Sequence, residues 1–199
     1  MNLRRILPFV VLLGFVGTPL AAQEEKQEYA APDMAEMMAA MEKAGAVTDH
    51  HRALEKMAGD WDVTMKMWTD PNADPMIVEF TATSEMIFGG RFLVEEVTGD
   101  FMGEPFEGYN VTGYNNVTGE YEVIWLDNMS TALLKSTGSM NEAGDEFASW
   151  GTMVDPMTGE EVKSRGVIRI MGDEMAAEGF EVRGGVERKT MEFLYKRKM

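Results

Sequence analysis

The sequence predicts an all-β fold, a closed antiparallel up-and-down barrel of about ten strands, preceded by one or two short N-terminal helices. Short runs of alternating apolar and polar residues follow one another from Trp61 to the C-terminus. Turn residues separate nearly every pair of runs, at intervals of about 8–14 residues. Connections this short join neighbouring strands as hairpins. Closing the sheet removes the exposed edges that such a long meander would otherwise leave.

The first 22 residues have the features of a signal peptide. Arg4 and Arg5 form a charged start, residues 6–16 are apolar, and residues 20–22 supply a small-residue cleavage region. We therefore expect an exported protein, periplasmic or extracellular. No second apolar stretch reaches membrane length, so no membrane insertion is expected once the signal is removed. The chain has no cysteine, which excludes a thiol nucleophile and a lipid attached to an N-terminal cysteine.

Two segments follow the signal. Residues 23–48 are predicted to form a polar leader and an amphipathic helix, and residues 49–199 the barrel domain. Asp33 can cap a helix over residues 34–44, one face of which carries Met34, Met37, Met38 and Met41. This spacing is typical of a helix that packs its apolar face against a barrel. A second short helix, capped by Thr48 or Asp49, leads into the first strand.

Each strand is bounded by turn signals. The runs predict strands over residues 61–67, 76–88, 91–100, 106–114, 121–126, 131–140, 146–154, 162–171, 175–183 and 186–197.

The charge excludes several classes of partner. The formal net charge is −16, and it becomes −18 once Arg4 and Arg5 leave with the signal. A chain this acidic is not expected to bind nucleic acid or anionic lipid heads. The only histidines, His50 and His51, are adjacent and cannot supply a metal-binding triad. We expect no metal, no cofactor and no catalytic residue, which favours a non-enzymatic protein and leaves an enzyme as an alternative.

Several sequence strings carry a family resemblance. Gly59-Asp60-Trp61 resembles the Gly-x-Trp signature of lipocalin-like barrels, where the tryptophan closes one end against an arginine of the last strand, here Arg188 or Arg197. Longer strings extend the match, namely GGRFLVEE at 89–96, MGEPFEG at 102–108, GYNN at 113–116, WLDNMST at 125–131 and DPMTGE at 155–160. Together they resemble a bacterial family of exported, calycin-like barrels known as a domain of unknown function.

The resemblance implies the barrel fold and an export route, with no established activity. The family is distantly similar to nitrobindins, small barrels that bind haem through a histidine late in the chain. Here both histidines precede the first predicted strand, so haem is not expected.

Polar residues inside the barrel would be candidates for ligand binding. Neighbouring strand residues point to opposite faces, so one of Glu95 and Glu96 faces inward and needs a partner such as Arg91 or Arg165. A polar anchor inside a largely apolar pocket would orient a ligand. The alternative is a buried ion pair that fixes the register of the barrel. Aromatic and polar residues also gather over residues 102–131, the expected barrel mouth. The candidate ligand-binding residues are Arg91, Glu95, Tyr109, Trp125, Asp127 and Arg165.

The function expected from these features is binding of a small, largely apolar ligand in the barrel interior. One alternative is a cell-envelope module that docks a protein partner, of unknown identity, through the methionine-faced helix. A second is an enzyme that uses an interior carboxylate and arginine. A third is Cu(I) binding by the helix methionines with His50 or His51.

Overall fold

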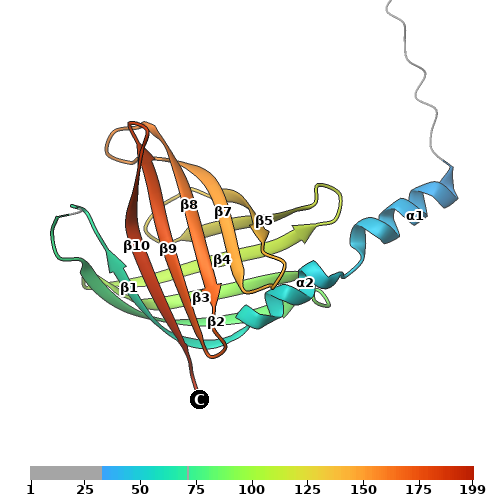
Figure 1. The fold of residues 1–199 in the computed structure, drawn as a ribbon, viewed down its shortest axis with the longest axis horizontal. Coiled ribbons are helices and arrows are strands. Elements are labelled where there is room, and N and C mark those ends of the chain that lie inside the picture. The colour runs from blue at the N-terminus through green and yellow to red at the C-terminus, as the bar shows by residue number, and fades with distance from the viewer. Residues whose placement is uncertain (1–32, 71) are drawn as a thin grey trace, which may run out of the picture.

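The computed structural model describes residues 33–70 and 72–199, so the predicted signal peptide and nearly all of the polar leader lie outside the described residues. Two short helices and one 3-10 turn precede ten antiparallel strands that close into a barrel (Figure 1). The predicted fold class is confirmed. The elements are α1 (Met34–Gly45), α2 (Asp49–Leu54), η1 (Glu55–Met57), β1 (Gly59–Met67), β2 (Met76–Ile87), β3 (Phe92–Phe101), β4 (Glu104–Asn115), β5 (Glu120–Asp127), β6 (Leu134–Met140), β7 (Glu146–Val154), β8 (Glu161–Ile170), β9 (Glu174–Arg183) and β10 (Val186–Arg197).

Each strand pairs with its neighbours in the chain, and β1 pairs with β10 to close the sheet. The closing register places Trp61 opposite Arg197 and Met67 opposite Met191. Hairpin turns make this order possible, because glycines such as Gly89 (φ 67°) and Gly90 (φ 87°) adopt a backbone conformation that side chains disfavour. The largest difference from the predicted strands is in β6, which begins at Leu134 instead of residue 131.

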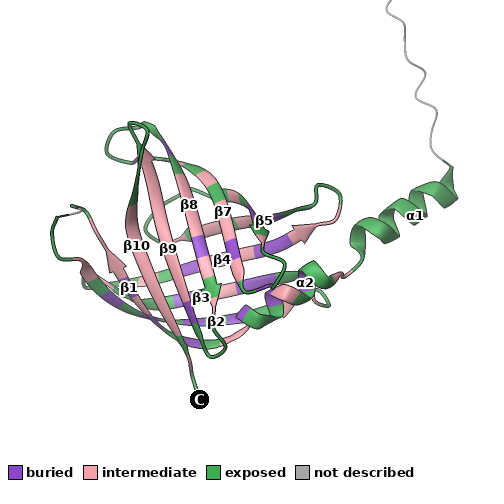
Figure 2. Ribbon diagram, viewed as in Figure 1, coloured by how far each residue is buried: buried purple, intermediate pink, exposed green. Residues whose placement is uncertain are grey.

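Alternation along the strands divides the wall into an inner and an outer face. Along β2 the residues from Val78 to Ser84 alternate between buried and exposed, and Figure 2 shows the buried positions as purple bands on the strands. Residues paired across antiparallel strands share a face, so the register extends this assignment around the barrel. We call the space enclosed by the ten strands the lumen.

The helices differ in how they meet the barrel. Helix α2 buries His51 and Leu54, whereas α1 buries no residue and projects away from the barrel (Figure 1). The prediction that the methionine face of α1 packs on the barrel is therefore wrong. The free carbonyls at the end of α1 are bonded by two barrel loops, since Asn116 Nδ2 donates to Ala46 O at 2.8 Å and Arg91 Nε donates to Gly45 O at 2.9 Å. The end of α1 is thus fixed while its apolar face stays uncovered.

Candidate functional site

One end of the lumen is closed by α2, η1 and the start of β1. Trp61 is fully buried, and its Nε1 donates to Met57 O at 3.2 Å. The Arg197 guanidinium lies 4.1 Å from the centre of the Trp61 ring, and Nη1 of Arg197 donates to Ala58 O at 2.8 Å. A cation placed over an indole face is attracted by the ring. The resemblance left Arg188 and Arg197 open as partners of this tryptophan, and the structure selects Arg197.

The two histidines belong to the same closure. His51 is buried, and its Nδ1 accepts a hydrogen bond from the Thr48 backbone N–H at 3.1 Å. Burial lowers the pKa of His51, partly offset by a hydrogen bond to the Tyr114 backbone. The His50 ring stacks on Tyr114 with 4.1 Å between centroids, and Tyr121 OH donates to His50 O at 2.9 Å. Both side chains are therefore occupied in packing and capping.

Small residues form one wall of the lumen. In the registers of β6, β7 and β8, serines and glycines alternate across the inner face. An added Cβ at Gly166 would lie 3.0 Å from Ser149 Oγ, so this serine hydroxyl lies over the glycine. Beta-sheet positions without bulky side chains let a ligand approach the backbone closely. This small-residue wall comprises Ser136, Gly138, Ser149, Gly151, Ser164 and Gly166.

Aromatic residues form a second wall on β2, β4 and β5. The Phe80 and Phe106 rings lie 5.0 Å apart, and Phe106 stacks on Trp125 with 6.4 Å between centroids and 19° between planes. Gly108 makes room for this arrangement, because a Cβ there would lie 2.5 Å from the Trp125 ring. This aromatic wall offers the apolar surface that a small-molecule site requires.

Asp127 holds Trp125 in place. One carboxylate oxygen accepts from Trp125 Nε1 at 2.8 Å. The other accepts from the backbone N–H groups of Met129 and Ser130, each at 3.0 Å. Asp127 therefore fixes the orientation of the Trp125 indole.

Glu95 is the isolated acid of the inner face. It lies between Ser84 and Asn110 in the register, and Tyr195, which stands on β10 beyond β1 and β2, is close enough to affect its pKa. Burial raises the pKa of Glu95 to about 7, and Tyr195 opposes this rise. Burial also raises the pKa of Tyr195, together with the nearby Glu95 charge. None of the ion pairs among the described residues includes Glu95.

Several inward side chains keep partial solvent exposure, although ten strands surround the lumen. Trp61 and Tyr121, at the closed end, are 0% and 2% exposed. Glu95, Tyr195 and Phe193 also point inward, yet they are only half-buried. Protein on all sides accounts for the raised pKa of Glu95 and of Tyr195.

The structure brings three of the six predicted site residues to the lumen and leaves three outside. Glu95, Trp125 and Asp127 occupy inward register positions. Arg91 lies in the turn after β2 and bonds α1. The six residues therefore do not share one face of the sheet.

Tyr109 and Arg165 face outward because their strand neighbours on each side face the lumen. Tyr109 pairs with Glu96 and Leu126 on the outer face. Arg165 lies 4.0 Å from the Phe180 ring centre and donates to both carboxylate oxygens of Glu187 at 2.8 Å. Arg165 is thus committed to an outer-surface contact.

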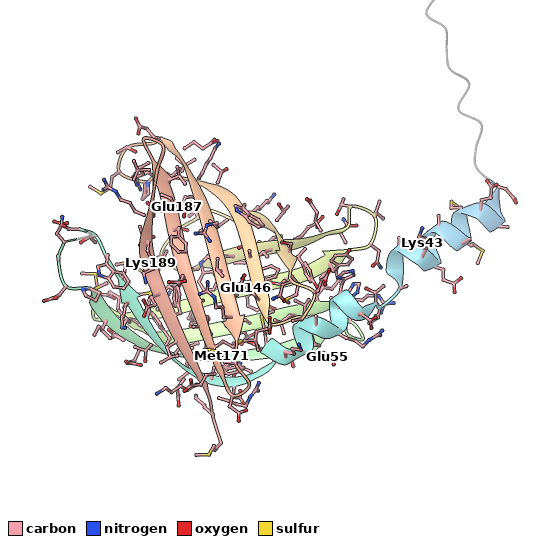
Figure 3. All side chains as sticks on the ribbon, viewed as in Figure 1. Lys43, Glu55, Glu146, Met171, Glu187 and Lys189 are labelled. Atoms are coloured by element: carbon pink, nitrogen blue, oxygen red, sulfur yellow. The ribbon has the colours of Figure 1, made fainter. Side chains whose placement is uncertain are left out.

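The outer surface carries a ladder of ion pairs over β1 and β7–β10. Nitrogen and carboxylate oxygen atoms of opposite charge lie 2.9 to 3.2 Å apart. Figure 3 labels Glu146 on β7 and Glu187 and Lys189 on β10. A hollow of about 260 Å³ lies among these charges beside Ala176. The charged side chains that line this hollow are already paired with one another and leave no free charge for a ligand. We therefore assign the candidate site to the lumen. The ladder consists of Lys66, Glu192, Lys189, Glu178, Arg169 and Glu146.

Two parts of the site, Tyr195 and the small-residue wall, were not predicted from the sequence. A signal for Tyr195 was present, since β1 and β10 close the barrel and Val63 pairs with Tyr195 on the face of Trp61. Among residues 33–70 and 72–199, no group of three or more acidic or histidine side chains is suited to hold a metal. In the same residues, no helix has the length and hydropathy needed to cross a membrane.

Comparisons with known proteins agree with this architecture. The crystal structure of Rv2717c from M. tuberculosis is similar, with a TM-score of 0.56 and 16% identity over 77% of this chain and all of that chain. At this identity the likeness concerns the fold alone. No curated protein sequence matches significantly. Residues 46–197 match the model of the protein family of unknown function DUF1579. That match spans the second helix and the whole closed barrel, and the chain therefore belongs to the DUF1579 family.

Proposed function

We propose that this protein binds a small, largely apolar molecule inside the lumen and performs no chemistry on it. The observation that carries the proposal is the half-buried state of large inward side chains such as Phe193 and Tyr195. An aromatic wall faces this space, and a few polar groups, Glu95 among them, line it. Mostly apolar, preformed cavities with few polar groups are the usual sites for small molecules.

Filling the lumen is expected to abolish binding. Ser149 faces inward and Ser139 faces outward on the adjacent strand, so Ser149→Phe and Ser139→Phe form a matched pair. N-phenyl-1-naphthylamine, an apolar fluorophore, should bind the natural chain and Ser139→Phe alike. Ser149→Phe should weaken its binding by at least about tenfold, which corresponds to about 1.4 kcal/mol. Equal titrations for both variants, with unchanged circular dichroism, would place the fluorophore outside the lumen.

Haem does not fit the residues of the lumen. A ligating histidine would need a free ring nitrogen facing the bound group. His51 uses its ring in hydrogen bonds to Thr48 and Tyr114, and His50 stacks on Tyr114 at the closed end. The distant similarity to nitrobindin-type barrels therefore extends, in our proposal, to the barrel and not to its cofactor.

A second candidate function is docking of a protein partner through α1, in an exported protein. Its support is the apolar face of α1, with Met34, Met38 and Met41 exposed by 63%, 64% and 67%. Loops bearing Arg91 and Asn116 fix the end of this helix to the barrel.

Replacing the four α1 methionines by glutamine tests this second candidate. A photo-crosslinking residue at position 36 of α1 should give one discrete protein adduct in cells. The methionine substitutions should remove that adduct while leaving the thermal unfolding of the barrel unchanged, because the face buries nothing within the barrel. An unchanged adduct, or none in the natural chain, would rule out docking through this face.

A further inference from the structure

The acid in the lumen lacks a cationic partner. Glu95 points into the barrel opposite Ser84, and its neighbour Tyr195 carries an uncharged hydroxyl. Of three arginines at inward register positions near the ends, Arg188 stands opposite Glu181, seven residues before Tyr195 on β10, and the other two are engaged elsewhere. Arg197 bonds the closed end and Arg183 pairs with Asp155 and Glu181. A carboxyl group in such surroundings is costly to ionise unless a cation joins it.

The rest of the lumen defines what could accompany that cation. The aromatic wall of Phe80, Phe106 and Trp125 offers apolar contact. The small-residue wall contributes hydroxyl groups but no charge. An anionic head group placed beside Glu95 would meet its charge with no cation at the adjacent register positions, which hold Ser84 and Asn110.

The overall charge acts in the same direction. A formal net charge of −16 produces a negative potential around the molecule, which attracts cations and repels anions as they approach. Long-range attraction and the local chemistry of Glu95 therefore favour the same class of ligand.

We propose that the lumen selects molecules that carry one basic nitrogen on an apolar body, with the nitrogen against Glu95 and Tyr195. This inference rests on the proposed binding function and specifies the ligand class. An ammonium group donates to the Glu95 carboxylate, and the apolar body lies along the aromatic wall. Hydrogen bonds between charged partners are stronger than those between neutral ones.

Three twelve-carbon probes with different head groups test the proposal. Dodecylamine, dodecanol and dodecanoic acid are titrated at pH 8 against the chain loaded with N-phenyl-1-naphthylamine. Dodecylamine should displace the fluorophore at a concentration about tenfold lower than dodecanol, and dodecanoate should be the weakest. Below pH 7 the advantage of the amine should shrink by up to about tenfold per pH unit, as Glu95 gains its proton.

Two variants assign the selectivity. Glu95→Gln should bind dodecylamine and dodecanol equally, whereas Glu96→Gln, on the outer face, should keep the preference for the amine. Unchanged dodecanol binding in Glu95→Gln verifies that its lumen is intact. A preference for dodecanoate, or an amine preference that survives in Glu95→Gln, overturns the inference while leaving the binding function in place. Failure of all three probes to displace the fluorophore would contradict both proposals.

Discussion

Replacing Trp61 by alanine is expected to lower the free energy of unfolding by about 3–5 kcal/mol, the usual cost of removing a buried tryptophan. Trp61 is fully buried among Leu54, Met57 and the first residues of the sheet. The substitution also removes the hydrogen bond to Met57 O and the ring beneath Arg197. Trp61 joins η1 to β1 through its hydrogen bond to Met57 O. The cavity left by removing its side chain would therefore open the closed end of the lumen.

Trp150 provides the matched control for this substitution. It lies on β7, points outward and is 50% exposed. Trp150→Ala is expected to change the free energy of unfolding by no more than about 1 kcal/mol. Urea unfolding followed by far-UV circular dichroism measures both variants. Similar losses for the two tryptophans would show that the closed end does not hold the barrel together.

Replacing Glu95 by glutamine is expected to stabilise the protein at pH 8 and to have little effect at pH 4. The pKa of Glu95 is about 7 in the folded barrel against an ordinary value of 4.5. The folded state therefore binds more protons than the unfolded state between these values, and stability falls as pH rises from about 4.5 to 7. Glutamine keeps an acceptor for Tyr195 and removes this penalty. We expect a gain of about 1–3 kcal/mol at pH 8, because water in the lumen reduces the full linkage value.

Glu96 is the control for the pH dependence. It is the next residue along β3, is exposed and faces outward beside Tyr109. Glu96→Gln should leave stability within about 0.5 kcal/mol of the natural chain at both pH values. Urea unfolding at pH 4, 6 and 8 gives the three curves. A Glu95→Gln gain that is the same at every pH would mean that ionisation of this carboxyl group is not its source.

The alternation of side chains between the two faces of a strand explains which parts of the site were predictable. The rule that one of Glu95 and Glu96 faces inward follows from alternation along a strand, and β3 follows it. The sequence could not select between them, because apolar residues occur on both faces of β3. Val94 is buried on the outer face and Leu93 on the inner face.

The same ambiguity misplaced Arg165. On β8, Val167 and Ile168 are neighbours on opposite faces and both are apolar, so the alternation is weak there. On β10 the register shifts between Lys189 and Met191, which changes the parity within one strand. A bulge of this kind inserts one extra residue, and nothing in the residue types announces it.

The sequence by itself determined the closed barrel and the order of its strands, and the family resemblance indicated the tryptophan that closes one end. These features depend on alternation, on turn residues and on local motifs, which neighbouring residues specify. The tertiary structure decided that Glu95 meets Tyr195, that Arg197 covers Trp61 and that α1 stands free of the barrel. Those contacts join strands and loops far apart in the chain. Their geometry arises only when the sheet closes with a particular register, which alternation alone does not fix.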